Sequence, residues 1–154
     1  MNPNIEQRNA LLAQTVIKGL ESRNMSGYYA ASREEALQLA LTLIPEDATV
    51  TMGGGTSVHE IGLVKALKEG NWNFIDRDEY TDKRAAMLLA YDADVFLSSC
   101  NAITEDGVLV NIDGNANRVS AIANHAVRVA GLAGAEDSKE LLSTIEPEDL
   151  EDWS

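Results

Sequence analysis

The sequence has few of the residues that hold metals and disulfides. It contains one cysteine, Cys100, and two histidines, His59 and His125. A single cysteine excludes a disulfide within the chain, and it excludes a zinc or iron–sulfur site built from several cysteines of one chain. The sequence therefore predicts no metal site and gives no sign of a cofactor.

Basic residues and long apolar runs are also scarce. The chain has 12 lysines and arginines against 25 acidic residues, a formal net charge of −13. So negative a surface repels phosphate backbones and anionic lipids, so we expect neither nucleic acid nor a membrane as a partner. No apolar run approaches the roughly 20 residues of a transmembrane helix. The first ten residues lack the basic and apolar regions of a secretory signal, which predicts a cytoplasmic protein.

What is present fits one globular domain. Of the 154 residues, 45% are hydrophobic and 24% are charged, which are ordinary values for a folded domain. The charge is uneven, because residues 135–154 hold eight acids and one base. We expect a folded domain over residues 1–134 and an acidic C-terminal helix or tail over residues 135–154. The alternative for this second segment is an acidic stretch that binds a partner.

Apolar spacing and helix-capping patterns predict alternating helices and strands. The expected helices are 5–23, 36–44, 57–70, 82–91 and 117–124. The expected strands are 28–31, 48–52, 72–75, 95–98, 108–112 and 127–132. Residues 32–35 and 57–60 each have the spacing of a capping box, which begins a helix. The alternation predicts a three-layer, Rossmann-like α/β domain with a mostly parallel sheet.

Three consecutive glycines follow the expected strand at 48–52 and precede a helix. The candidate ligand-binding residues of this turn are Gly53, Gly54, Gly55, Thr56 and Ser57. Glycines let backbone N–H groups approach a ligand, and a helix N-terminus adds partial positive charge, which suits phosphate or carboxylate. The alternative is a tight turn that needs glycine for its geometry alone. We expect His59, nearby, to be a solvated surface residue rather than a catalyst.

A polar stretch, residues 98–107, follows the expected strand at 95–98. In open parallel sheets ligands bind at the carboxyl ends of the strands. The candidate binding residues here are Asn101, Thr104 and Asp106, and the candidate acid or base is Glu105. The alternative is a polar hairpin loop with Asx-type turns. We expect Cys100 to be a buried small residue rather than a nucleophile, because no activating base is identified.

A third polar stretch, residues 111–118, follows the strand segment Gly107–Val110. Its candidate ligand-binding residues are Asn111, Asp113, Asn117 and Arg118. An arginine can hold a carboxylate or phosphate through two parallel hydrogen bonds. The alternative is an ion pair between Asp113 and Arg118.

The run Ser-Cys-Asn-Ala-Ile-Thr-Glu-Asp-Gly-Val-Leu-Val-Asn-Ile-Asp-Gly-Asn-Ala-Asn-Arg-Val at 99–119 resembles the signature of the LUD domain, a lactate-utilisation domain of LutC/YkgG type. Residues 53–63 are similar to that family's glycine-rich strand–helix turn. The resemblance covers roughly residues 5–123 and implies the fold of the NagB/RpiA/CoA-transferase group. In several members of that group the glycine turn holds phosphate and an acid in the later loop performs the chemistry.

The resemblance also bears on catalysis. Isomerases of the group carry an acid where this chain has Asn101, and an amide cannot exchange a proton as a carboxylate does. Glu105 lies at a place similar to a glutamate of longer lactate-utilisation subunits, so it is the catalytic candidate that the resemblance implies.

Several functions are consistent with these patterns. The first is binding of a small anionic metabolite, phosphorylated or carboxylated, in a cleft formed by the glycine turn and the two polar loops. The resemblance implies a context of organic-acid (lactate) metabolism. The alternatives are a non-catalytic subunit of a lactate-oxidising complex with redox partner subunits, or an isomerase-like or CoA-transferase-like enzyme that uses Glu105. A dinucleotide-binding domain is disfavoured because the Gly-x-Gly-x-x-Gly fingerprint is missing. A homodimer is the expectation from general frequencies.

Overall fold

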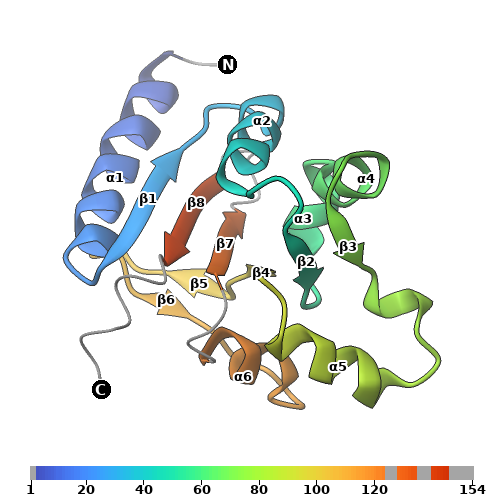
Figure 1. Ribbon diagram of the computed structural model, residues 1–154. Coiled ribbons are helices and arrows are strands. Elements are labelled where there is room, and N and C mark those ends of the chain that lie inside the picture. The colour runs from blue at the N-terminus through green and yellow to red at the C-terminus, as the bar shows by residue number, and fades with distance from the viewer. Residues whose placement is uncertain (1–2, 124–127, 135–139, 146–154) are drawn as a thin grey trace.

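The computed structural model describes residues 3–123, 128–134 and 140–145 (Figure 1). The helices are α1 (Pro3–Glu21), α2 (Arg33–Leu43), α3 (Thr56–Glu60), α4 (Leu63–Glu69), α5 (Lys83–Tyr91) and α6 (Asn117–Ala123), with a short 3₁₀ helix, η1 (Arg77–Glu79). The strands are β1 (Met25–Tyr29), β2 (Thr49–Met52), β3 (Asn73–Ile75), β4 (Val95–Ser99), β5 (Ala102–Ile103), β6 (Leu109–Val110), β7 (Arg128–Gly134) and β8 (Glu140–Ile145). Within these ranges no helix has the length and apolar character needed to cross a membrane.

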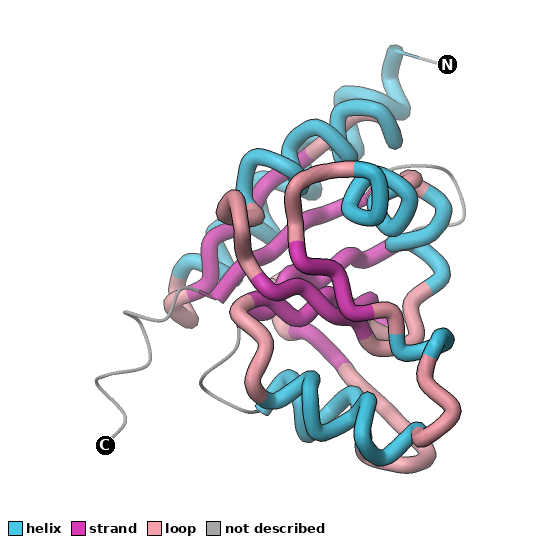
Figure 2. Tube along the Cα trace, turned by 45° about the vertical axis from the view of Figure 1, so that its right-hand side comes forward, coloured by secondary structure: helices cyan, strands magenta, loops and turns pink. Residues whose placement is uncertain are grey.

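Six of these strands form one sheet in the order β1-β8-β7-β4-β2-β3. The strands β3, β2, β4 and β7 are parallel to one another, whereas β8 is antiparallel to both β7 and β1. Helices lie on both sides of the strands (Figure 2). The fold is therefore a three-layer, Rossmann-like α/β arrangement with a mostly parallel sheet, which confirms the prediction.

The side chains of β4 alternate between two hydrophobic cores, one on each face of the sheet. Val95 and Leu97 belong to the larger core, which α2, α3 and α4 cover, whereas Phe96 packs with Ala90 of α5 and Ala121 of α6. Successive side chains of a strand point to opposite faces of its sheet. The three layers therefore follow from the apolar run in β4, which is buried on both faces.

The order of the strands creates a crevice between β2 and β4. From β2 the chain runs through α4 to β3 on one side, and then through α5 to β4 on the other side. The chain leaves β2 toward α3 on one face of the sheet and leaves β4 toward α6 on the other face, so the loops at the carboxyl ends of β2 and β4 diverge. Ligands bind at such a switch point in open α/β sheets. The glycine turn and the polar stretch after β4 both begin here.

The two expected capping boxes have different outcomes. The first is confirmed, because the backbone N–H of Glu35 donates to Ser32 Oγ over 3.1 Å and the Glu35 carboxylate accepts from the Ala31 N–H over 2.9 Å. The second is wrong, since α3 begins at Thr56 with Gly55 as its N-cap and no side-chain cap. The serine of the expected box lies inside the helix instead.

The single helix expected over residues 57–70 is two helices. Gly62 has a φ of 80° and separates α3 from α4. Glycine adopts this left-handed conformation without the steric cost that other residues meet. The expectation was therefore wrong at this position, and the glycine is the physical reason.

The C-terminal expectation also needs correction. Residues 140–145 form β8, which pairs with β7 on one side and with β1 on the other. The helix predicted there is wrong, because this short stretch, with two leucines, a threonine and an isoleucine, obtains strand pairing along both of its edges. The rest of the segment 135–154 lies outside the described residues.

The expected strand at 108–112 is shorter than predicted. Only Leu109–Val110 form β6, which pairs antiparallel with β5 in a small hairpin. The strand β5 was not predicted, but the turn signal at Asp106 and Gly107 was right, since Gly107 turns the chain with a φ of 79°.

Two glycines hold this hairpin against α1. A Cβ on Gly19 would lie 2.0 Å from the carbonyl oxygen of Asp106, and a Cβ on Gly107 would lie 2.5 Å from the backbone nitrogen of Leu20. Arg23 closes the contact, because its guanidinium donates to the carbonyl oxygens of Gly19 and Asp106 over 2.7 Å each. The polar residues that flank the hairpin are therefore positioned by α1.

We expect Gly19→Ala to lower the stability of the protein. The added methyl would meet backbone, which cannot move aside, and overpacking of this kind costs about 1–3 kcal/mol. The better helix propensity of alanine returns at most about 1 kcal/mol, so a net loss remains in the free energy of unfolding measured with urea. The matched control is Gly114→Ala, where a Cβ meets nothing within 4 Å. Equal stability of the two variants would contradict the contact.

Candidate functional site

A polar cleft lies where the glycine turn faces the end of β4. The turn is fixed to β4 by the Gly53 N–H, which donates to the Leu97 carbonyl over 3.0 Å. The cleft has a volume of about 260 Å³. Its lining residues come from the three stretches that the sequence singled out, and they are Gly54, Gly55, Thr56, Ser57, Ser99, Cys100, Asn101 and Arg118.

Arg118 joins these stretches through its guanidinium. One terminal nitrogen donates to the Ser99 carbonyl and, over 2.9 Å, to Asn111 Oδ1. The other donates to Asn101 Oδ1 over 2.7 Å and to the Ile112 carbonyl over 2.9 Å. Four of the five N–H donors of an arginine are therefore engaged by the protein itself, and the loops around the cleft are tied to one side chain.

All four acceptors of Arg118 are neutral oxygens. Among the described residues, no carboxylate lies within ion-pair distance of this guanidinium. Its positive charge is therefore not neutralised, although the chain as a whole carries a formal charge of −13. A charge held in this way at the wall of a cleft raises the local concentration of anions.

Asp113 does not form the ion pair that was the alternative for this stretch. Its carboxylate accepts from the backbone N–H groups of Arg118 over 2.6 Å and Val119 over 3.2 Å, and from that of Asn115 over 3.1 Å. Desolvation acts to raise the pKa of Asp113, but these backbone hydrogen bonds and the nearby Arg118 charge outweigh it and hold the pKa below its usual value. Asp113 thus caps the first turn of α6, the helix that carries Arg118.

The hydroxyl of Ser99 is buried at the cleft without a hydrogen-bond partner among the described residues. A Cβ on Gly55 would lie only 2.7 Å from this oxygen. Buried polar atoms are nearly always satisfied in folded proteins, by the protein or by a bound molecule. The orphaned hydroxyl therefore gives the cleft a donor for a group bound there.

His59 is a surface residue, as the sequence predicted, whereas Cys100, which was expected to be buried, is only partly so. Cys100 lines the cleft and is half-buried, and this burial raises the pKa of its thiol despite the opposing effects of a backbone hydrogen bond and the Arg118 charge. A protonated thiol is a poor nucleophile. His59 is exposed on α3. In the described part of the chain, histidines, cysteines and acids form no group of three that could hold a metal ion.

Thr104, Glu105 and Asp106 are not brought to the cleft. They form the exposed tip of the β5–β6 hairpin, where the Thr104 hydroxyl donates to Asp106 over 2.5 Å. This bond is the main cause that lowers the pKa of Asp106, which also forms an ion pair with Arg23 over 3.4 Å. The tip is directed to α1 by the glycine contact, so the cleft receives from this stretch only the residues before the hairpin.

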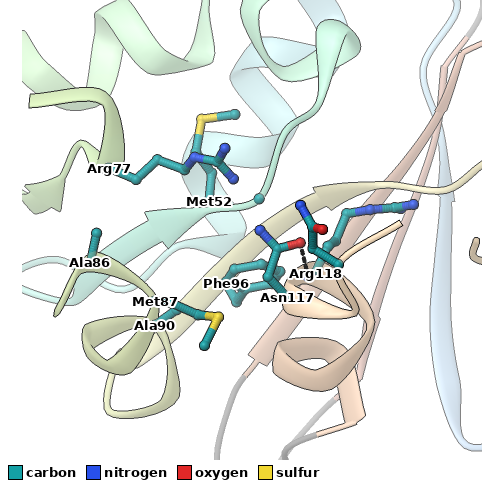
Figure 3. A pocket seen from close by; sticks show the side chains of 10 residues that line it. Met52, Arg77, Ala86, Met87, Ala90, Phe96, Asn117 and Arg118 are labelled. Carbon is teal, nitrogen blue, oxygen red and sulfur yellow. Dashed lines mark hydrogen bonds between the residues drawn. The ribbon is translucent and has the colours of Figure 1, made fainter. Parts of the chain in front are cut away.

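Sequence reasoning missed a second cavity, which adjoins the polar cleft at the glycine turn. Its volume is also about 260 Å³. The lining residues come from six separate segments and are Met52, Gly53, Arg77, Ala86, Met87, Ala90, Phe96, Asn115, Asn117 and Arg118 (Figure 3). The one available signal was the pair Ala86 and Ala90, which places two small residues one helical turn apart on the inner face of α5.

The second cavity has apolar walls and a polar rim. The side chain of Met87 points toward the ring of Phe96, and Asn117 lies above them on α6 (Figure 3). Arg118 contributes its aliphatic stem, while its guanidinium extends away from the apolar side chains. A Cβ on Gly53 would lie 3.0 Å from Arg118 Cγ and 3.1 Å from Phe96 Cζ, so a larger residue would need these side chains to shift by a few tenths of an ångström.

The model of the LUD domain matches residues 13–135. This chain belongs to the LUD domain family. The matched part of the LUD domain includes the whole glycine turn and both polar stretches, so it contains every residue that lines the polar cleft. The curated proteins and the solved structures give no significant match.

The cap on α6 gives the LUD domain a pH-dependent contribution to stability. Because folding lowers the pKa of Asp113 below 3.8, this contribution is present above that pH and is lost as the pH falls through the folded value. We expect Asp113→Asn to lower the melting temperature at about pH 7, and the difference from wild type to close in acid. The control is Asp92→Asn at the C-terminal end of α5. A difference that persists at low pH would contradict the cap.

We also expect Arg118→Lys to destabilise the LUD domain although it conserves the charge. The ammonium group of lysine cannot replace the planar guanidinium, which donates hydrogen bonds to four oxygens on three segments. Loss of two or more of these hydrogen bonds costs about 1–3 kcal/mol in the free energy of unfolding. The control is Arg84→Lys at an exposed position of α5, which should change stability by no more than about 0.5 kcal/mol. Equal effects of the two substitutions would rule out the joining role.

Proposed function

We propose that this LUD domain binds a small organic anion, a carboxylate or a phosphate, in the polar cleft, and that it serves organic-acid utilisation of the lactate type. The observation that carries the proposal is the guanidinium of Arg118, whose charge is met by four neutral oxygens at the wall of the cleft. In so acidic a chain, a positive charge without a carboxylate partner is an attractive site for an anionic ligand.

The arrangement divides the work of binding between groups. The terminal nitrogens of Arg118 already have protein acceptors, so Arg118 contributes its charge and the order of the loops rather than a two-pronged grip. Hydrogen bonds to the anion come instead from the hydroxyls of Thr56, Ser57 and Ser99, which line the cleft. The glycines leave the backbone accessible beside them, as close approach to an anion requires.

The arrangement also bears on the alternative functions. Glu105 is exposed at the hairpin tip and does not line the cleft, so we assign it no reaction with the bound anion. A role as a non-catalytic subunit of a lactate-oxidising complex is the second candidate. In that role the redox centres would lie on partner subunits, because Cys100 is the only cysteine of the chain and one cysteine cannot hold an iron–sulfur cluster.

The direct test is thermal unfolding with lactate, pyruvate, inorganic phosphate and sugar phosphates as probes. A probe present at roughly 100 times its dissociation constant stabilises the folded protein by about 2.7 kcal/mol, which raises the melting temperature of a chain of this size by several degrees. No shift with any probe, on protein that unfolds in a clean transition, would refute the proposal. Recovery of iron–sulfur or flavin subunits with the native protein would then favour the second candidate.

Gly54→Ala is the variant that locates the anion. A Cβ on Gly54 would meet no protein atom within 4 Å, so stability should not change, but the methyl would stand in the polar cleft. We expect affinity for the bound probe to fall by roughly ten-fold or more, equivalent to about 1.4 kcal/mol, in titration calorimetry. Gly114→Ala is the matched control, because its Cβ is equally free of contacts and it lines neither cavity. Unchanged affinity in Gly54→Ala would place the anion elsewhere.

A further inference from the structure

We propose that the second cavity holds the organic body of the same ligand, so that the ligand is an anion carrying a flat apolar group of about ring size. This inference rests on the proposed function, because it takes the anionic group to lie in the polar cleft. It goes further by assigning the ligand's size and chemical class.

The two cavities meet at the same residues. Gly53 lines the second cavity and Gly54 lines the polar cleft, and successive Cα atoms are only about 3.8 Å apart. Arg118 lines both, with its stem in the second cavity and its guanidinium bonded to the loops around the cleft. The two cavities therefore lie on either side of the contact between Gly53 and the Arg118 stem. A ligand that passes beside this contact needs only a short chain of covalent bonds to occupy both.

The walls of the second cavity select an apolar body. Phe96, Ala86 and Ala90 are no more than 6% exposed, and the Met87 side chain lies beside the ring of Phe96. An apolar cavity of roughly 150 Å³ is enough to bind a benzene-sized molecule, so a volume of about 260 Å³ accommodates one ring with space at its edge. Lactate, with a single methyl group as its apolar part, would leave most of this volume unfilled.

The polar residues at the rim of the second cavity indicate that the edge of the ligand's ring carries polar atoms. Asn115 and Asn117 place amide groups there, and Arg77 adds a guanidinium that lies 3.7 Å from its neighbour Asp78. Amides offer both donors and acceptors, and a methionine and a phenylalanine give good contacts to a flat ring. The lining therefore fits a ring that is apolar on its faces and polar at its edge, attached to a carboxylate or a phosphate.

Matched probes test this division without changing the protein. We compare inorganic phosphate with phenyl phosphate, and lactate with 3-phenyllactate, by titration calorimetry on the full chain. Burial of a phenyl group contributes enough to raise affinity roughly ten-fold or more within each pair. If both members of each pair bind equally, the bipartite ligand is refuted while the proposed function stands. If no member of either pair binds, the proposed function fails and this inference fails with it.

The methyl signal of Met87 reports where the ring binds. The chain has four methionines, and ¹³C-labelled methyl groups give one resonance each. A ring beside Met87 should shift that methyl resonance through its ring current, while Met25 in β1, which lines neither cavity, stays unchanged. The phenyl probes should produce this shift and their parent anions should not. Tighter binding of the phenyl probes with an unshifted Met87 signal would place the ring elsewhere and refute the inference.

A pair of substitutions on α5 provides the final control. Ala86→Leu fills part of the second cavity, so it should remove the preference for the phenyl probes and leave the affinity for inorganic phosphate or lactate unchanged. Ala85→Leu adds the same volume on the same helix at a residue that lines neither cavity, and it should keep the preference. A preference that survives Ala86→Leu in folded protein would refute the inference, and the wild-type comparisons decide it if this variant does not fold.

Discussion

The hydrogen bonds of Arg118 are the interaction on which the rest of the site depends. One guanidinium binds the end of β4, the turn at Asn101 and the chain after β6, while its stem packs against Gly53. Since α6 carries Arg118, the cap that Asp113 gives to this helix also fixes where the guanidinium stands. The charge that attracts an anion is thus the same group that shapes its binding place, and the two properties cannot vary independently.

The second constraint on the site comes from outside it. The β5–β6 hairpin packs against α1 through Gly19 and Gly107. This contact directs Thr104, Glu105 and Asp106 away from the strand ends. The same packing contact holds Asn101 and Asn111 within hydrogen-bonding distance of Arg118, because these two residues flank the hairpin. A helix with no residue in the polar cleft therefore decides which part of the polar stretch belongs to the binding site and which part belongs to the scaffold.

The parts of the fold predicted from sequence are those with local causes. The strand at residues 48–52, the glycine turn after it and the cap at Ser32 depend on neighbours in the chain, and they are close to what the patterns indicated. The strand β8 was missed because its pairing with β1 and β7 outweighs its acidic surroundings. The acceptors of Arg118 and the second cavity were missed because they arise only when distant segments pack together.

The insertion of β8 between β1 and β7 has a consequence for the order of assembly. Among the described strands, β1 has β8 as its only partner in the sheet. During synthesis the N-terminal segment leaves the ribosome first, yet its strand has no place to pair until residues 140–145 have followed. The pairing of β1 therefore forms only after β8 has been synthesised. The strand β8 then joins the N-terminal part of the chain, α1 and β1, to the parallel strands at the centre of the sheet.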